Sequence, residues 1–344
     1  MECGCEEMDL PLATLAVAYG ADLLIGDPHW FPHPVRGMGL AIVWGERVLR
    51  RAIPWERLAG AALVVLVVGG STAAAWWLLR ALSAQPVSWG FAAGAALLWS
   101  CLSTKDLALE SGSVLKALEA GDLGAARVRV ARIVGRDTQR LDEPEVVRAT
   151  IETIAESTMD GIIAPLCFFV AGGIPGAVAY KAVNTLDSMV GHRSARYLRF
   201  GWAAAALDTA ANWIPARVSA GCFVASAWLC RCRASAAWRC ARLDGAIGTV
   251  PNAGWPEAAM AGALGVRLGG VNWYEGRATT MPYMGQPLRP LAAQRIHEAI
   301  RLMYTCSIVA WLAAMGALMM KSSVQAPGFM LQAARLACSL QPAA

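Results

Sequence analysis

The chain has 344 residues, of which 56% are hydrophobic and only 16% are charged. Soluble domains contain about 25% charged residues, so this composition excludes an ordinary soluble domain and a disordered chain. The net charge of +5 comes from 30 basic residues scattered among 25 acidic ones, without the dense basic stripe of a nucleic-acid-binding protein. These numbers are typical of an integral membrane protein with charged loops.

Long apolar runs predict the membrane-spanning helices. About 20 apolar residues are needed, because the hydrocarbon core is about 30 Å thick and a helix rises 1.5 Å per residue. Three uncharged runs reach that length, at residues 58–79, 81–104 and 302–320, and the first two are expected to form a helical hairpin. A shorter run, 10–26, is interrupted by Asp22. We expect it to be retained, since the acidic residues before it lack the basic character of a cleaved signal peptide.

Two further apolar runs are interrupted. Residues 161–180 carry no charge, but four helix-breaking residues lie at the centre of this run: Gly172, Gly173, Pro175 and Gly176. We expect a broken or re-entrant helical hairpin, because irregular backbone at membrane depth must be satisfied by protein or by a water-filled cavity. Residues 200–230 are apolar but contain Asp208, Pro215 and Arg217. The sequence therefore predicts about five spans and leaves a sixth open.

Polar segments lie between these runs. Residues 105–160 show a helical pattern with a turn at 121–124, whereas residues 231–301 are rich in Gly and Pro and are expected to be dominated by loops. Basic residues are enriched in short cytoplasmic loops, so we expect residues 27–57, 105–160 and 231–242 of a multi-pass membrane protein to face the cytoplasm. The predicted fold is a single all-α, polytopic membrane domain in five parts: 10–104, 105–160, 161–230, 231–301 and 302–320.

The ten cysteines lie mostly in apolar runs or in two C-x-C pairs. Neither pair has the C-x-x-C spacing of a zinc or redox site. We expect reduced, structural thiols; a peripheral metal site is the alternative.

A row of carboxylates predicts a magnesium site. Glu152, Glu156 and Asp160 recur at every fourth residue and share one helix face. Like charges at this spacing repel, so the row requires cations. Arg148 can neutralise one carboxylate, and Mg²⁺ with a substrate phosphate can meet the others, because Mg²⁺ prefers oxygen ligands. The alternative is a solvated acidic face.

Two polar segments border the apolar runs. The three prolines of residues 27–36 restrict the loop that presents Asp27, His33 and Arg36, although a simple interfacial turn is equally consistent with them. Residues 181–193 combine a cation, amides, hydroxyls, a carboxylate and an imidazole. Polar groups beside lipid are costly and point to function, and a capped helix end is the alternative. The sequence has no phosphate-loop, dinucleotide-binding, zinc-protease or serine-hydrolase motif, so any nucleotide site is of another type.

Four strings carry a family resemblance: GDPHWFPHPVR, VGRDT, YKAVNTLDSMVGHR and PNAGWPEAAMAGALGVRLGG. In this order, and over most of the chain, they resemble the adenosylcobinamide-phosphate synthase family of cobalamin biosynthesis, also called CobD/CbiB. The resemblance implies a multi-pass enzyme of the inner (cytoplasmic) membrane. It is expected to be a carbon–nitrogen ligase that joins (R)-1-amino-2-propanol, or its O-phosphate, to the f side-chain carboxylate of adenosylcobyric acid while ATP is hydrolysed. It also implies ATP and Mg²⁺ as cofactors, a corrinoid substrate, and the lipid bilayer and other corrinoid-pathway enzymes as partners, with no nucleic acid.

For such a ligase the candidate residues take three hypothetical roles. Base and other catalytic roles are assigned to Asp187, His192, Glu257 and Asp137. Substrate and phosphate binding are assigned to Asp27, His33, Arg36, Arg136, Lys181, Asn184, Arg193, Asp208, Arg217 and Asn252. Metal binding is assigned to Glu152, Glu156 and Asp160. The active site is expected to face the cytoplasm.

Two other functions remain open at this point. A broken helix beside buried charges would also suit a transporter of an anionic or corrinoid substrate. A transporter predicts mid-span charges repeated in two halves, and the uncharged runs and the absence of a visible repeat argue against it. A non-catalytic membrane scaffold for corrin enzymes is the second alternative, and it leaves the density of polar motifs unexplained.

Overall fold

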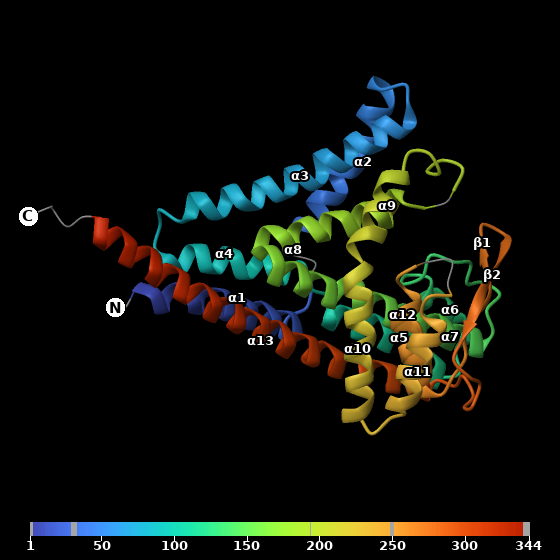
Figure 1. Cartoon of the computed structure of the whole chain (residues 1–344). Coiled ribbons are helices and arrows are strands. Elements are labelled where there is room, and N and C mark those ends of the chain that lie inside the picture. Colours follow the sequence, from blue (N-terminus) through green and yellow to red (C-terminus); the bar gives the residue numbers. More distant parts are fainter. Residues whose placement is uncertain (1–2, 29–32, 193, 248–250, 340–344) are drawn as a thin grey trace, which may run out of the picture.

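The chain folds into an apolar helical bundle with a polar end (Figure 1). The computed structural model describes residues 3–28, 33–192, 194–247 and 251–339. Its helices are α1 (Cys3–Leu24), α2 (Pro34–Ala52), α3 (Glu56–Leu82), α4 (Val87–Trp99), α5 (Thr104–Glu119), α6 (Leu123–Val130), α7 (Glu143–Thr158), the π-helical turn η1 (Met159–Ile163), α8 (Ala164–Val190), α9 (Trp202–Ala211), α10 (Trp213–Leu229), α11 (Ala234–Asp244), α12 (Gly254–Leu264) and α13 (Gln294–Ser339). Its strands are β1 (Leu268–Tyr274) and β2 (Arg277–Met284).

Within these ranges, four helical stretches have the length and composition of membrane spans: Glu56–Leu82, Val87–Glu119, Glu143–Val190 and Gln294–Ser323. Helix α1 contributes a shorter apolar segment. The predicted hairpin of residues 58–79 and 81–104 is present as α3 and α4, which are joined by a short turn. The expectation of an all-α, polytopic membrane fold is therefore confirmed.

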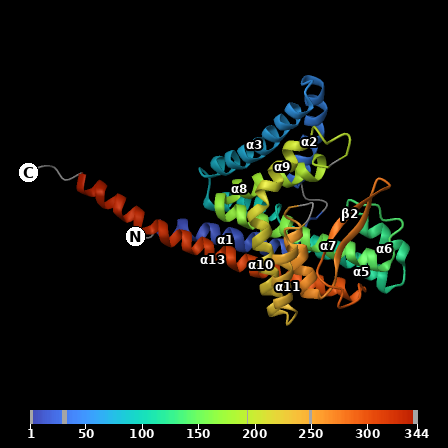
Figure 2. The ribbon, with the colours of Figure 1, turned by 45° about the vertical axis from the view of Figure 1, so that its right-hand side comes forward.

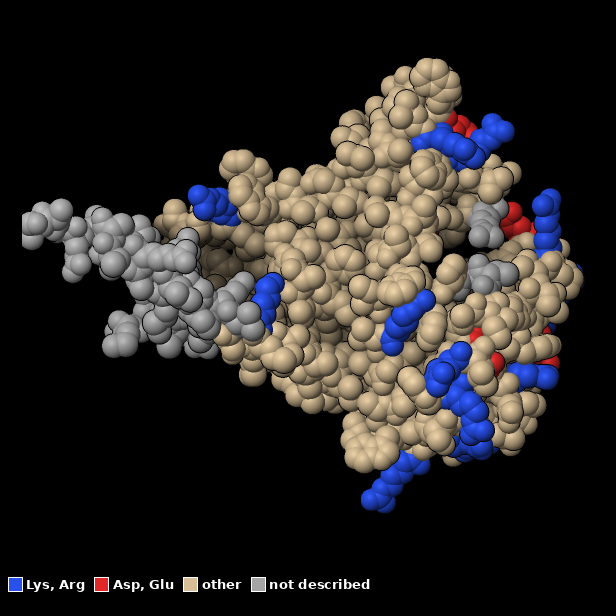
Figure 3. All heavy atoms as spheres, in the orientation of Figure 1, with Lys and Arg blue, Asp and Glu red and all other residues tan. Residues whose placement is uncertain are grey.

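Charged side chains are segregated to one end of the molecule. On the face shown in Figure 3 the body is almost free of charge, and lysine, arginine, aspartate and glutamate gather at the right-hand end. That end contains α5 to α7, α11, α12 and the β-hairpin, whereas both termini point away from it (Figures 1 and 2). This segregation is the arrangement expected of a bundle embedded in lipid with one polar, water-facing end.

The run 161–180 forms the predicted broken hairpin. Gly172 and Gly173 have non-helical backbone angles, and Gly173 has a φ of +63°, which other residues rarely adopt. The two arms pack closely, since a Cβ atom at Gly176 would lie 2.5 Å from the backbone oxygen of Phe168. The rings of Phe168 and Tyr180 stack with their centroids 5.0 Å apart. The expectation of a broken hairpin is confirmed.

Asp22, which interrupts the first apolar run, has a structural partner. Its side chain is completely buried, and its Oδ2 accepts a hydrogen bond of 3.0 Å from the backbone N–H of Thr104, the first residue of α5. Carboxylates at helix N-termini satisfy free N–H groups and complement the helix dipole. Tyr19 on the same helix is hydrogen-bonded to Ser307 of α13 at 2.7 Å. Helix α1 is therefore hydrogen-bonded to both α5 and α13.

The two polar segments differ in how well the sequence predicts them. Residues 105–160 form α5, α6 and α7 with a turn near Gly121, as expected. The expectation of a loop-dominated segment at 231–301 is wrong, because it contains α11, α12 and an antiparallel β-hairpin. Glycines with positive φ, including Gly265 and Gly276, form turns at the ends of these elements, so residues that suggested loops instead delimit ordered structure.

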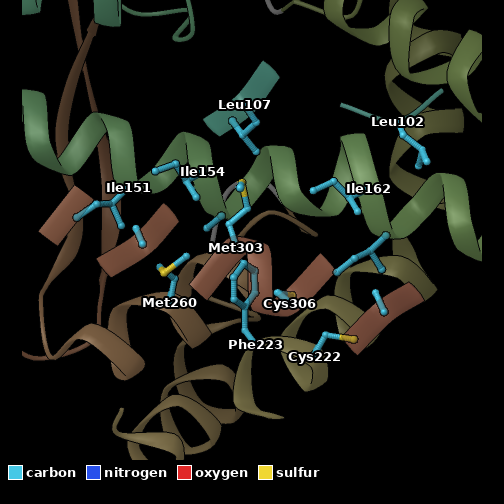
Figure 4. Close-up of a cluster of buried hydrophobic side chains, with 14 of the residues drawn as sticks. Leu102, Leu107, Ile151, Ile154, Ile162, Cys222, Phe223, Met260, Met303 and Cys306 are labelled. Carbon is cyan, nitrogen blue, oxygen red and sulfur yellow. The ribbon is translucent and has the colours of Figure 1, made fainter. Parts of the chain in front are cut away.

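A buried cluster holds α7 in place. Figure 4 shows Ile151 and Ile154 of α7 facing Met260 of α12, Phe223 of α10 and Met303 of α13. All five side chains are fully buried. Because these residues occupy the inner face of α7, its acidic face is directed away from the core.

The seven cysteines whose side chains the structure describes are unpaired, in agreement with the expectation of reduced thiols. Cys101, Cys222 and Cys306 are buried in the bundle. The other four of these seven cysteines are partly buried: Cys167, Cys230, Cys232 and Cys240.

Candidate functional site

A cavity of about 190 Å³ opens between α7, α12 and the β-hairpin. Its apolar wall includes Ala149 and Met284. Its polar wall consists of side chains from four segments of the chain: Arg136, Glu152, Glu156, Glu257, Asn272 and Tyr274. Four of these six were predicted from the sequence as site residues, and the cavity brings them together from positions up to 121 residues apart.

Glu152 is held by two arginines. Its Oε2 accepts a hydrogen bond of 2.8 Å from Arg136 Nη1, and its Oε1 accepts one of 3.2 Å from Arg148 Nη1. The backbone N–H of Gly269 donates to Oε1 at 2.8 Å. The arginine side chains are only 5% and 8% exposed, so these ion pairs are shielded from water. Both oxygens of Glu152 are therefore occupied by protein donors.

The same arginines bind the β-hairpin to α7. Arg148 donates to the backbone oxygens of Gly269 and Val271 at 2.7 and 3.1 Å, and to Asn272 Oδ1 at 3.0 Å. Arg136 also donates to Asn272 Oδ1. We call Arg136, Arg148, Glu152 and Asn272, with the backbone of Gly269, the Glu152 network. Sequence reasoning gave Arg148 only a neutralising role and missed Asn272, because no local pattern links residue 148 to a strand more than 120 residues later.

The cavity combines a cation with two further carboxylates. Arg136 Nε and Nη2 are buried and have no hydrogen-bond acceptor among the residues that the structure describes. A buried guanidinium with unsatisfied N–H groups is suited to bind an anion, since carboxylates and phosphates match its geometry. Glu156 is exposed to solvent at the cavity, and Glu257 is partly exposed. Burial, followed by repulsion from Glu152 and Glu156, raises the pKa of Glu257 well above its usual range.

A second polar group lies between α8, α9 and η1. The Tyr180 hydroxyl donates to Asn212 Oδ1 at 2.9 Å and lies 3.3 Å from Asp160 Oδ1. Asn212 Nδ2 donates to Asp208 Oδ2 at 3.1 Å. Burial, followed by repulsion from Asp187, raises the pKa of Asp208 to about 7. The structure thus brings together Asp160, Asp187 and Asp208, which the sequence placed on separate segments.

A third group is formed by Asp27, His33 and Arg36. Asp27 Oδ1 lies 3.7 Å from His33 Nε2 and 3.6 Å from Arg36 Nη2. Burial lowers the pKa of His33, and the positive charges of Lys181 and Arg36 act in the same direction, although Asp27 opposes them. Lys181 also interacts electrostatically with Asp160. The charge of Lys181 therefore acts on both His33 of the third group and Asp160 of the second.

Several predicted site residues have other surroundings. The Asp137 carboxylate accepts a hydrogen bond of 2.8 Å from the backbone N–H of Gly276, and its own N–H donates to Trp273 at 2.8 Å, so Asp137 anchors the tip of the β-hairpin. The Arg217 guanidinium stacks on Trp213, 3.9 Å from the ring centroid.

The remaining predicted residues lie on or near α8 and α12. Asn252 donates to the backbone oxygen of Thr209 at 2.7 Å. Asn184 is partly buried on α8, and its backbone oxygen accepts a hydrogen bond from Ser188. His192 is exposed after α8 and interacts electrostatically with Asp187. Arg193 lies outside the described residues.

The predicted metal ligands do not form one ligand set. Across the described parts of the chain, no group of three or more Asp, Glu, His or Cys residues is arranged to hold a metal ion. Glu152 is engaged by arginines, and Asp160 lies in η1 beside Tyr180. Mg²⁺ usually takes only one or two carboxylates together with substrate phosphates. Glu156 and Glu257, which line the same cavity and interact electrostatically, are the pair that fits this chemistry.

Most of the chain is similar to proteins of a single known family. Residues 15–303 match the model of the family described as CobD/Cbib protein. The cobalamin biosynthesis protein CobD of Geobacter metallireducens is 47% identical over 292 residues, which cover 85% of this chain and 92% of that protein. The CobD of Pelobacter propionicus is 44% identical, with coverage of 86% and 91%. The cobalamin biosynthesis protein CbiB of Salmonella typhi is 40% identical, with coverage of 88% and 95%. No solved structure matches the chain.

Proposed function

This chain belongs to the CobD/CbiB family of cobalamin biosynthesis, and from that premise we propose that it is a membrane-bound amide ligase. The reaction joins (R)-1-amino-2-propanol, or its O-phosphate, to the f side-chain carboxylate of adenosylcobyric acid. A carboxylate, an ammonium group and ATP are converted to an amide, ADP, inorganic phosphate and a proton. The product is adenosylcobinamide or its phosphate.

The chemistry defines what the site has to supply. A carboxylate is a poor acceptor for an amine, and an acyl phosphate is the usual activated form. Its formation transfers the terminal phosphoryl group of ATP to a carboxylate oxygen and releases ADP. The amine nitrogen then bonds to the acyl carbon, the carbon–oxygen bond to phosphate breaks, and the nitrogen loses a proton. The site therefore needs groups that hold phosphate oxygens and a base close to the amine.

The observation that carries this proposal is the cavity, which is lined by Arg136, with its unsatisfied N–H groups, and by the carboxylates of Glu156 and Glu257. Arg136 would bind a phosphate or carboxylate through Nε and Nη2. Glu156 and Glu257 would hold Mg²⁺, which supplies charge neutralisation for phosphoryl transfer. We assign the role of accepting the amine proton to Asp187. Its carboxylate interacts electrostatically with Asp208 and Glu156.

The size of the cavity supports the proposal that small groups bind inside it and the corrinoid binds outside it. Pockets that enclose drug-sized ligands measure about 300–1,000 Å³. A cavity of about 190 Å³ is too small for a corrin ring but accommodates a phosphate group or a short amine. The corrinoid would then remain outside and present only its side-chain carboxylate. We assign contacts with the corrinoid periphery to Asp27, His33, Arg36 and Lys181, which interact with one another electrostatically.

The test is a reconstitution. The protein, purified in nanodiscs, receives adenosylcobyric acid, the aminopropanol phosphate, ATP and Mg²⁺, and the product is followed by mass spectrometry. We expect product only with all four components. Glu156→Gln should lower turnover at least about 100-fold, and a higher Mg²⁺ concentration should recover part of the loss.

Glu119→Gln is the matched control, because Glu119 is exposed at the end of α5, away from the cavity. It should retain wild-type turnover. Wild-type protein that binds the corrinoid tightly but yields no product would contradict the ligase and favour a transporter or scaffold. Full activity in Glu156→Gln would remove the carboxylate pair from the mechanism.

A further inference from the structure

Helix α10 lies across the bundle at the level where the apolar runs end. Before its first residue, Asn212 is hydrogen-bonded to Tyr180, the last residue of the uncharged run 161–180. After its last residue, Cys230 Sγ lies 3.2 Å from Thr305 Oγ1, near the start of the apolar run 302–320 of α13. Both ends of α10 are therefore tied to the polar ends of two membrane-embedded elements. Figures 1 and 2 show the helix crossing the direction of α13 at this boundary.

The outward face of α10 is apolar except for Arg217, whose guanidinium stacks on the Trp213 ring. Ile214, Val218 and Trp228 are 61%, 37% and 73% exposed. At 100° per residue they lie on one side of the helix, and Gly221 between them faces open space. The opposite side is buried against the protein and includes Ser219 and Ser226. With 17 residues and this orientation, α10 resembles an interfacial helix rather than the sixth span that the sequence left open.

An arginine-rich surface continues from this apolar face. Residues 228–247 contain four arginines and one aspartate. Arg231, Arg239 and Arg242 are exposed, and Trp238 beside them is 53% exposed. Helices α10 and α11 pack against each other, and on the face shown in Figure 3 the basic side chains gather over the α11 end, beside the uncharged surface of the body. Tryptophan with arginine is the combination typical of the lipid headgroup layer.

We propose that α10 and α11 form a binding surface for anionic phospholipids. Ile214, Val218 and Trp228 would insert at the boundary between the acyl chains and the headgroups. Arg231, Arg239 and Arg242 would contact phosphate groups of anionic lipids in the same leaflet. We choose lipid as the occupant because the positive arginines complement the negative phosphates of the headgroups. The apolar strip lies beside them, at the level where the membrane spans end. Since Asn212 immediately precedes α10 and donates a hydrogen bond to Asp208, bound lipid would also set the position of Asp208 at the candidate site.

The experiment measures lipid binding without turnover, so its outcome is independent of the proposed ligase. Delipidated protein in detergent is titrated with phosphatidylglycerol or phosphatidylcholine, and bound lipids are counted by native mass spectrometry. We expect phosphatidylglycerol to bind more tightly. Arg239→Gln with Arg242→Gln should weaken its binding about 25-fold, since each arginine near an anionic lipid surface contributes roughly fivefold.

Arg129→Gln with Arg140→Gln is the matched control, because these arginines are exposed on the polar end beyond the apolar face. This control should bind phosphatidylglycerol like the wild type. A photoactivatable phosphatidylglycerol should label peptides from residues 213–242 in the wild type. Equal binding of the two lipids, unchanged binding in the Arg239/Arg242 variant, or labelling confined to other helices would each overturn the proposal.

Discussion

The molecule contains two hairpins that are held by different forces. The helical hairpin of α8 is formed within one apolar segment, where Gly176 packs against the backbone of Phe168. The β-hairpin is polar and is bound to α7 by Arg148 and Glu152, which precede it by more than 110 residues. The first hairpin depends on close backbone packing, and the second depends on shielded ion pairs.

This difference indicates how the candidate site is assembled. The helical hairpin places Tyr180 and Lys181 next to Asp160 through local chain reversal. The β-hairpin, which is distant from α7 in the sequence, closes the cavity and contributes Asn272 to its wall. Damage to the helical hairpin should therefore affect folding of the bundle, whereas damage to the Glu152 network should affect both stability and the shape of the cavity.

The largest effect is expected for Arg148→Met. It leaves Glu152 with one arginine and removes the donors to two backbone oxygens of β1, and loss of one partner from a buried ion pair costs about 3–5 kcal/mol. Thermal unfolding in detergent should show a large decrease in melting temperature, and ligase turnover should fall. Arg132→Met is the control, because its ion pair with Glu110 is 59% exposed at Arg132 and surface pairs contribute about 0–1 kcal/mol. Equal effects of the two variants would contradict the buried network.

Gly176→Val tests the helical hairpin. Side-chain atoms at this position would overlap the backbone of Phe168, and overpacking of this kind costs about 1–3 kcal/mol. We expect a lower melting temperature and a smaller yield of monodisperse protein in size-exclusion chromatography. Gly172→Ala is the control in the same hairpin, since its φ is −129° and a Cβ meets nothing within 4 Å. A stable Gly176→Val variant would mean that the two arms are not closely packed.

Tyr180→Phe removes only the hydroxyl that joins α8 to α9. The hydrogen bond to Asn212 is buried, and a typical bond of this kind contributes about 0.5–1.5 kcal/mol. The melting temperature should decrease by a few degrees, and the effect should be non-additive with Asn212→Ala because the two residues share one bond. Tyr283→Phe, whose side chain is exposed on β2, should have no effect. Additive losses for Tyr180 and Asn212 would show that they act separately.

The smallest effect is expected for Asp137→Asn. An asparagine oxygen can still accept the hydrogen bond from Gly276, so the anchor of the β-hairpin is retained while the charge is lost. We expect turnover within about twofold of the wild type, whereas Asp137→Ala should be less stable by about 1 kcal/mol. An inactive Asp137→Asn variant with an unchanged melting temperature would restore the catalytic role that the sequence predicted.

The sequence predicted the features that rest on local patterns. The glycines and the proline at residues 172–176 indicated the broken hairpin, because their effect on backbone geometry does not require a distant partner. The spacing of Glu152 and Glu156 placed both on the outer face of α7, and both line the cavity. The uncharged runs predicted α3, α4 and α13, since lipid imposes the same length and polarity on any spanning helix.

The sequence alone determined that this protein is a helical membrane protein with a broken hairpin and an acidic helix face, because those properties follow from neighbouring residues. Only the tertiary structure decided which carboxylates are neutralised and which remain for a ligand. Glu152 meets Gly269 across 117 residues, and Asp22 meets Thr104 across 82. The energy of a buried charge depends on the groups within a few ångströms of it, and those groups come from chain segments that no local pattern connects.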